Sequence, residues 1–268
     1  MSDMLIRFHT RSLFGASRLR LLMPDDAPFY PYITENNPYY NRPAKTLVIL
    51  HGFSGDECTW LYQGRAQELC LRYNLNIVLA NGNISFYLNR VESGQNYCTF
   101  IGEDLMAFLR KTFSIAERRE DTLIAGESMG GFGALHTGFA YPDTFGHIIA
   151  LSSGLIQHEV SEMKPEGGGN FAANYEYYRT VFGEPEKLLE SDNNPETLVK
   201  KMKAAGKQAP KVFMACGTED FLLPTNIEFR DFLEREGIPV DFHIGEGEKH
   251  DFAFWNRMMD LALPWALA

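Results

Sequence analysis

The sequence contains few cysteines, and their spacing does not match a metal site. Cys58, Cys70, Cys98 and Cys216 have neither C-x-x-C spacing nor histidines at the intervals that a metal site requires. Reduced thiols in a cytoplasmic protein are the simplest account of this pattern. We therefore expect a cytoplasmic location.

Long apolar segments, a secretion signal and an excess of positive charge are also missing. Residues 1–9 lack the basic region and apolar run of a secretion signal, and no stretch is suited to span a bilayer. The formal net charge of −10 argues against nucleic acid or an anionic membrane as the main partner. The charge selects no substrate, and the sequence leaves open whether the chain forms a homo-oligomer.

What the sequence does contain is the composition of an ordinary globular domain. Its 268 residues are 45% hydrophobic and 22% charged, which fits one large α/β domain or at most two small ones. There is no internal repeat and no low-complexity tract. Apolar runs predict strands at residues 4–10, 17–23, 46–50, 75–79, 121–125, 145–151, 211–216 and 240–244. Intervening patterns predict helices at residues 63–73, 100–113, 129–140, 224–236 and 251–262.

The alternation of strands and helices predicts the architecture. It implies a mostly parallel sheet with helices on both faces, and the first two strands suit an antiparallel hairpin at one edge. Residues 24–45 are rich in Pro, Asn and Tyr and are expected to form a loop. Ligands of such a sheet bind at the carboxyl ends of the strands.

The alternation lapses at residues 155–209. This stretch contains Gly167–Gly169, several charges and three tyrosines within four residues. We interpret it as a mostly helical, cap-like excursion above the sheet. It belongs to a single domain that spans residues 1–268.

The stretch that organises the rest is Gly126-Glu127-Ser128-Met129-Gly130. It joins a predicted buried strand to a predicted helix, which is the context in which G-x-S-x-G indicates a nucleophile elbow. The sharp turn exposes the serine hydroxyl, and the glycines avoid collisions with the neighbouring elements. The alternative is a glycine-rich turn that carries an incidental serine.

A serine nucleophile needs a histidine base and a carboxylate that orients it, each after a later strand. The loop after residues 211–216 offers Glu219 and Asp220, and Asp220 is preferred because it lies nearer the loop tip and precedes apolar residues. The loop after residues 240–244 offers His250, whereas Asp251 better suits the cap of the final helix. The histidines that we set aside are His136, His147, His158 and His243.

Acyl transfer also requires donors for an oxyanion. The first expected donor is the backbone N–H of Met129, and the second is the N–H of Phe53 in the loop after residues 46–50. The glycines of that loop are alternatively needed only to turn the chain. For Glu127, a carboxyl group buried beside the nucleophile, we expect a structural hydrogen bond.

These motifs together resemble those of one family. Residues 50–55, 81–87, 126–133, 217–220 and 249–256 are similar to segments of α/β-hydrolases of the esterase D group, above all bacterial tributyrin esterases. S-formylglutathione hydrolases and feruloyl and acetyl-xylan esterases are related. The resemblance implies the α/β-hydrolase fold, the triad Ser128, Asp220 and His250, and oxyanion donors at Phe53 and Met129. His51 and Gly55 depart from the formylglutathione hydrolases, which have serine and cysteine there, so a general short-acyl esterase is favoured.

The expected function is therefore that of a serine carboxylesterase acting on a small acyl ester without a cofactor. Alternatives are a thioesterase, a feruloyl or acetyl-sugar esterase, or a non-catalytic binding protein of the same fold. The complete set of catalytic residue types argues against the last. The aromatic residues expected to line the substrate pocket are Trp60, Phe86, Tyr87, Phe252 and Trp255.

Overall fold

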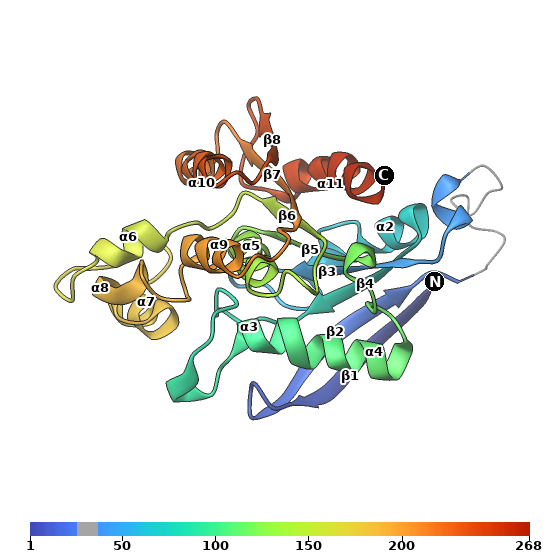
Figure 1. The fold of residues 1–268 in the computed structure, drawn as a ribbon, viewed down its shortest axis with the longest axis horizontal. Coiled ribbons are helices and arrows are strands. Elements are labelled where there is room, and N and C mark those ends of the chain that lie inside the picture. Colours follow the sequence, from blue (N-terminus) through green and yellow to red (C-terminus); the bar gives the residue numbers. More distant parts are fainter. Residues whose placement is uncertain (26–36) are drawn as a thin grey trace.

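The structure is a computed structural model that describes residues 1–25 and 37–268. These residues form one sheet whose strands are β1 (Ser2–Thr10), β2 (Gly15–Met23), β3 (Lys45–Leu50), β4 (Leu75–Ala80), β5 (Thr122–Glu127), β6 (His147–Leu151), β7 (Lys211–Gly217) and β8 (Val240–Gly245). The strands lie in the order β1-β2-β4-β3-β5-β6-β7-β8 (Figure 1).

The pairing of the strands confirms the predicted mixed sheet. β1 and β2 form an antiparallel hairpin, β2 pairs antiparallel with β4, and all later neighbours are parallel. β5 runs two residues beyond its predicted end, because Gly126 and Glu127 still pair with Ala150 and Leu151 of β6. Ser128 therefore follows directly after the last residue of β5.

The helices are α1 (Thr59–Tyr62), α2 (Ala66–Tyr73), α3 (Tyr97–Thr99), α4 (Met106–Phe113), α5 (Met129–Ala140), α6 (Gln157–Glu162), α7 (Tyr175–Phe182), α8 (Pro185–Leu188), α9 (Pro195–Ala204), α10 (Leu223–Arg235) and α11 (Phe252–Leu267). A π-helical segment, η3 (Phe100–Leu105), joins α3 to α4. Short 3₁₀ turns occupy Pro38–Asn41, Val91–Ser93 and Arg119–Asp121.

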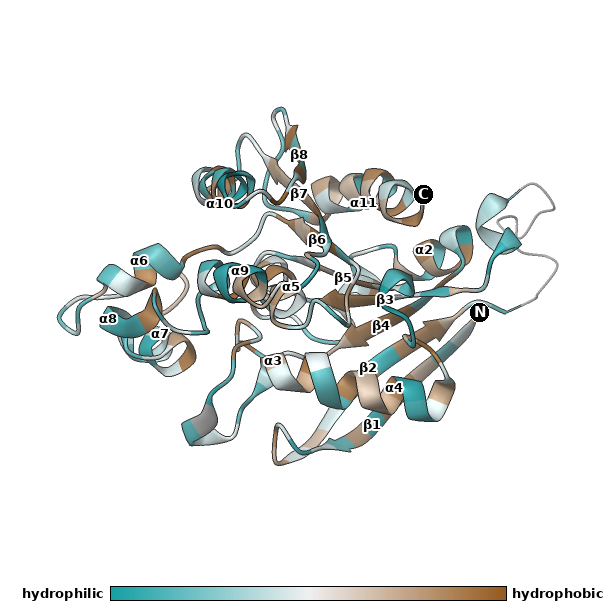
Figure 2. Cartoon of the chain, in the orientation of Figure 1, coloured by the Kyte–Doolittle hydropathy of each residue, from teal (hydrophilic) through white to brown (hydrophobic). Residues whose placement is uncertain are grey.

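Two apolar layers cover the sheet. Side chains of α2 and α11 form a core on one face, and side chains of α4, α5, α9 and α10 form a core on the other. The central strands are mostly brown in Figure 2, whereas the covering helices also carry teal, hydrophilic residues. Burial on both faces explains why these strands have continuous apolar runs rather than alternation.

Two helix boundaries differ from the prediction. The helix predicted at 63–73 begins three residues later, as α2 at Ala66, and the separate short helix α1 precedes it. Gly64 lies between the two, where a Cβ would lie 2.4 Å from a carbon of the Trp60 ring. The last helix continues to Leu267, five residues beyond its predicted end, through Pro264. Leu263, Ala266 and Leu267 are buried there, and their packing outweighs the backbone hydrogen bond that proline removes.

Residues 155–209 contain α6, α7, α8 and α9. In Figure 1 the first three of these helices gather at one end of the molecule, in yellow, while α9 lies beside α5. Buried Leu198, Val199 and Met202 of α9 belong to the core on the α5 face of the sheet. Of the loop predicted at 24–45, residues 26–36 lie outside the described part of the chain.

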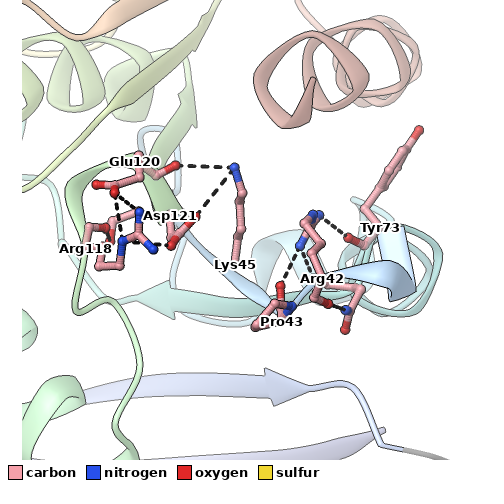
Figure 3. A network of polar contacts seen from close by, with 9 residues as sticks. Arg42, Pro43, Lys45, Tyr73, Arg118, Glu120 and Asp121 are labelled. Atoms are coloured by element: carbon pink, nitrogen blue, oxygen red, sulfur yellow. Dashed lines mark hydrogen bonds and ion pairs between the residues drawn. The ribbon is translucent and has the colours of Figure 1, made fainter. Parts of the chain in front are cut away.

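Charged residues gather at the amino ends of the central strands (Figure 3). Lys45, the first residue of β3, lies 3.6 Å from an Asp121 oxygen and donates to the Glu120 carbonyl group (3.4 Å). Arg42 donates to the carbonyl groups of Pro43 (2.9 Å) and Tyr73 (3.0 Å). This polar end lies opposite the carboxyl ends of β3, β5, β6 and β7, where the predicted catalytic loops lie.

Candidate active site

The predicted nucleophile Ser128 lies in a strained turn between β5 and α5. Its φ of 56° and ψ of −120° fall in a region that non-glycine residues rarely adopt. A Cβ on Gly126 would lie 2.2 Å from the carbonyl oxygen of Gly130, and one on Gly130 would lie 2.0 Å from that of Leu50. Both glycines are therefore required for β3, β5 and α5 to approach one another.

Backbone hydrogen bonds fix this turn to the neighbouring loop. The Ser128 N–H donates to the carbonyl oxygen of Leu151 (2.9 Å). The Ser128 carbonyl oxygen accepts from Gly154 N–H (2.8 Å) and from Phe132 N–H (3.1 Å). The strained conformation is thus held by β6 and α5.

Asp220 and His250, which were predicted as acid and base, are in contact. His250 Nδ1 lies 2.8 Å from Asp220 Oδ2, and the N–H of Leu222 donates to Asp220 Oδ1 (2.9 Å). Burial would raise the pKa of Asp220, but the hydrogen bonds from His250 and Leu222 together hold it below its ordinary value. An ionised Asp220 only accepts hydrogen bonds, so Nδ1 carries the hydrogen and Nε2 is left as an acceptor.

The competing candidates have other partners. Asp251 caps α11 by accepting from Phe254 N–H (3.0 Å), as its position predicts. Glu219 is exposed and lies 3.5 Å from the Lys249 ammonium group. His243 contacts Asp241 (2.9 Å) and stacks on a neighbouring phenylalanine. The three remaining histidines lie on α5, β6 and α6, and the structure places His136 against Asp192, His147 against Trp265 and His158 against Glu196.

Ser128 and His250 line the same cavity, which has a volume of about 810 Å³. Phe53 and Met129, which were predicted to supply the oxyanion donors, line it as well. Met129 is the first residue of α5, where the helix dipole favours negative charge. The cavity therefore brings these four residues together from three separate segments of the chain.

The aromatic residues predicted to line the pocket divide into two groups. Phe86, Phe252 and Trp255 line the cavity. Trp60 and Tyr87 do not, so their assignment to the pocket is wrong: both are fully buried. The indole N–H of Trp60 donates to Glu127 (2.6 Å), and the Tyr87 hydroxyl donates to the His51 carbonyl group (3.0 Å). They support the cavity wall from behind.

Glu127, whose role the sequence left unresolved, connects two parts of the site. Its Oε1 accepts from Gly52 N–H and its Oε2 accepts from Trp60 Nε1–H, both at 2.6 Å. Complete burial raises the pKa of Glu127 to about 8, although these two donors oppose the shift. The expected structural hydrogen bond is therefore present, and it reaches the loop that carries Phe53.

Two contacts of the site were not foreseen from the sequence, namely the role of Ser152 and the packing of Phe221, expected only to shield Asp220, against His250. The ring of His250 contacts those of Phe221 and Trp255, each with its centroid 5.0 Å away. The Trp255 indole N–H donates to Ser152 Oγ (3.0 Å), which fixes the ring beside the histidine. Ser152 has a φ of 45° and follows β6 directly, but neither property is visible in the residue type. An apolar residue next to the predicted acid was the one available signal for Phe221.

The charge of the lining is one-sided. Glu127, Glu159 and Asp251 line the cavity, and no lysine or arginine does so within the described residues.

No three His, Cys, Asp or Glu side chains of residues 1–25 and 37–268 are grouped so as to hold a metal ion. The four cysteines are free thiols. In the part of the chain that the structure describes, no helix is long and apolar enough to cross a membrane.

Comparison with known proteins identifies the family. The family described as "Putative esterase" matches residues 34–263. An acetyl esterase of Caldicellulosiruptor saccharolyticus is 39% identical over 265 residues, which cover 99% of this chain and 98% of that protein.

Solved structures agree. The substrate-bound fluorophosphonate-binding serine hydrolase F of Staphylococcus aureus superposes with a TM-score of 0.83 at 26% identity, covering 100% of this chain and 98% of the other. An S-formylglutathione hydrolase of the same organism superposes with a TM-score of 0.79 at 26% identity, covering 100% and 99%. The predicted resemblance and the predicted fold are confirmed. The chain belongs to this esterase family and is a serine ester hydrolase with the α/β-hydrolase fold.

Proposed function

We propose that this protein is a carboxylesterase of short-chain acyl esters and that Ser128, His250 and Asp220 are its catalytic triad. The contact between His250 Nδ1 and Asp220 Oδ2 (2.8 Å), in the cavity that the strained Ser128 also lines, carries this proposal. Asp220 holds the imidazole so that Nε2 accepts the serine proton as Ser128 Oγ attacks the ester carbonyl carbon. His250 then protonates the leaving alcohol, and water releases the acyl group from Ser128 by the reverse proton transfers.

The tetrahedral intermediate needs two hydrogen-bond donors for its oxyanion. The backbone N–H groups of Phe53 and Met129 take this role, because both residues line the cavity beside Ser128. Preorganised donors of this kind stabilise the transition state more than the substrate, and each contributes about 10²–10³ in kcat.

The size of the acyl group follows from the residues above the serine. Residues 155–209 act as a cap within a single domain, and Ile156 and Tyr178 of this cap face the cavity together with Phe86. We expect acetyl to butyryl groups to fit best, in keeping with the name of the acetyl esterase relative. The protein works in the cytoplasm and needs no cofactor.

The cavity has room for more than a short acyl group. Six heavy atoms of a butyryl ester occupy at most roughly 180 Å³ if each takes the volume of a water molecule, against a cavity of about 810 Å³. The remainder suits a bulky alcohol, so an acetylated sugar or a feruloyl ester is the second candidate. Thr59, Gln63 and Thr225 in the lining offer hydrogen bonds to such an alcohol.

A glutathione thioester fits less well. Its two carboxylates would enter a cavity with acidic Glu159 and Asp251 and, within the described residues, without a lysine or arginine in the lining. We therefore expect neutral esters to be preferred over anionic thioesters.

The decisive experiment compares the wild type with Ser128→Ala on chromogenic acetyl and butyryl esters. The variant should fold normally, since it removes one oxygen, and its activity should fall by about 10⁶, to the residual level left by binding and the oxyanion donors. Circular dichroism checks the fold. Activity within a few-fold of the wild type would refute the triad, and two inactive proteins would favour a binding function.

A further inference from the structure

Two buried side chains hold Gly52 from opposite sides. Glu127 Oε1 accepts from the Gly52 N–H at 2.6 Å, and His51 Nδ1 lies 2.8 Å from the Gly52 carbonyl oxygen. The tautomer of His51 follows from its other nitrogen, because Gly82 N–H donates to Nε2 at 2.9 Å. Nε2 is therefore the acceptor, and Nδ1 carries the hydrogen that it donates to Gly52.

The bond to the Gly52 carbonyl group also sets the direction of the next N–H. The C=O of Gly52 and the N–H of Phe53 belong to one planar trans peptide, so they point in opposite directions. Rotating the Phe53 N–H away from the cavity would break the hydrogen bonds that the Gly52 carbonyl oxygen accepts from His51 Nδ1 and from Gly55 N–H (3.1 Å). It would also leave a buried polar group without a partner, at a cost of about 1–3 kcal/mol.

Glu127 in turn is fixed by a second donor. The indole N–H of Trp60 donates to Oε2 at 2.6 Å, and both side chains are fully buried. The space around Gly52 is tight, since a Cβ there would lie 3.1 Å from Glu127 Oε1 and 3.3 Å from Ser128 Cβ. Glu127 is adjacent to the nucleophile in the chain, so one residue fixes the distance between Ser128 and the Phe53 loop.

We propose that Glu127 is a positioning residue which, together with His51, aims the Phe53 N–H at the oxyanion. This inference rests on the proposed triad and oxyanion donors. Glu127 acts through the Gly52 backbone and takes no part in proton transfer, so its loss should lower kcat and leave KM nearly unchanged.

The test exploits the two donors that face Glu127. The kinetics are measured above pH 8, where Glu127 is ionised and both its oxygens are acceptors. In Glu127→Gln the amide has one acceptor and one donor end, so either Gly52 N–H or Trp60 N–H faces an NH₂ group. We expect kcat to fall about 10- to 100-fold, less than the 10²–10³ of a lost donor, with KM within about threefold. Adding Trp60→Phe removes the competing donor and frees the amide oxygen for Gly52. The double variant should therefore have a higher kcat than Glu127→Gln, although it has lost more buried packing.

Controls separate positioning from stability. Asn74→Ala removes a buried amide outside the cavity lining, whose Nδ2 donates to the carbonyl groups of Tyr39 and Arg42 (both 3.0 Å), and should lower Tm without lowering kcat. A trifluoromethyl ketone, which forms an oxyanion on Ser128, should bind Glu127→Gln more weakly in proportion to the loss of kcat/KM.

A second pair of variants tests the same peptide if Glu127→Gln does not fold. His51→Asn places an amide N–H where Nδ1 lies, whereas His51→Leu offers no donor, so kcat of the asparagine variant should be at least about tenfold higher. Equal kcat for these two variants, or a kcat for Glu127→Gln within threefold of the wild type, would overturn the inference. So would a double variant that is slower than Glu127→Gln. If Ser128→Ala stays inactive in those cases, the proposed function stands and only the positioning role fails.

Discussion

The floor and the rim of the cavity are built in opposite ways. The floor consists of the turn at Ser128 and the loop at Gly52, where backbone atoms of β3, β5 and α5 meet and a Cβ on Gly130 would lie 2.0 Å from a carbonyl oxygen. At the rim, Phe171 and Phe221 are 83% and 58% exposed and contact each other edge to face at 5.3 Å. Gly167, four residues before Phe171 in the chain, has no atom within 4 Å of an added Cβ.

This difference indicates that the floor carries out the reaction and the rim selects the substrate. The floor must hold a nucleophile and two donors within a few tenths of an ångström, and close packing of backbone on backbone provides that rigidity. The rim touches only the variable parts of a substrate, so side chains there can change without disturbing the reacting atoms. Substitutions in the floor should consequently abolish activity, and those in the rim should change preference.

Among substitutions that keep the Ser128 nucleophile, the largest effect is expected for Asp220→Asn, which alters the support of the floor. An asparagine would favour the wrong tautomer of His250, and the expected loss in kcat is about 10⁴. Steady-state kinetics with a butyryl ester measures it, with Glu219→Gln and Asp251→Asn as controls. If one of the controls is crippled while Asp220→Asn is nearly silent, the acid has been misassigned.

A pair of glycine substitutions tests the comparison through stability. Gly130→Ala would drive a methyl group into the Leu50 carbonyl group and should destabilise the fold by roughly 3 kcal/mol or more. Gly167→Ala has open space but a φ of 76°, so it should cost about 1–2 kcal/mol. Urea denaturation of both variants gives the difference. Similar values for the two would show that the floor relaxes as easily as the open turn at Gly167.

The pH dependence of stability gives a third, smaller contrast. Burial raises the pKa of Glu127 from 4.5 to about 8, so the folded protein retains a proton that the unfolded chain loses in between. The contribution of Glu127 to the free energy of unfolding is fully present below pH 4.5. It declines as the pH rises toward 8, by on the order of a few kcal/mol. Glu127→Gln should flatten this decline, whereas Glu159→Gln at the rim should retain it. An unchanged profile in Glu127→Gln would contradict the assignment.

The floor was also the more predictable region. The succession of strands along the chain and the turn at Ser128 follow from local patterns, namely apolar runs, G-x-S-x-G and glycines at set positions. The rim and the wall depend on contacts between distant segments. Phe86 and Tyr87 are adjacent and both have positive φ, yet one lines the cavity and the other packs behind it. No property of the residue types distinguishes them.

Glu127 illustrates the same limit. Its burial beside the nucleophile was evident, but its partners Gly52 and Trp60 are 75 and 67 positions away in the chain. A buried carboxyl group must find donors, and the sequence does not say which. Only the folded arrangement of β3, β5 and α1 identifies them.

The smallest effect is expected at the rim, from Phe171→Ala. Phe171 packs on Phe221, which in turn lies against the ring of His250, so the substitution opens the mouth of the cavity without reaching Ser128. With the wild type, kcat/KM should rise about fourfold for each methylene that fits, since burial of one contributes about 0.8 kcal/mol. It should then fall beyond butyryl, where the cap excludes longer chains.

The variant should keep the kcat for an acetyl ester and shift the optimum by one or two carbons, which a series from acetyl to palmitoyl esters measures. Phe14→Ala, an equally exposed phenylalanine in the β1–β2 turn, is the matched control and should leave the series unchanged. Comparable kcat/KM for butyryl and palmitoyl esters in the wild type would show that the cap opens to long chains. The assignment of chemistry to the floor and substrate selection to the rim would then be wrong, because a rim that opens does not select by size. Selection of the acyl chain would have to come from the floor.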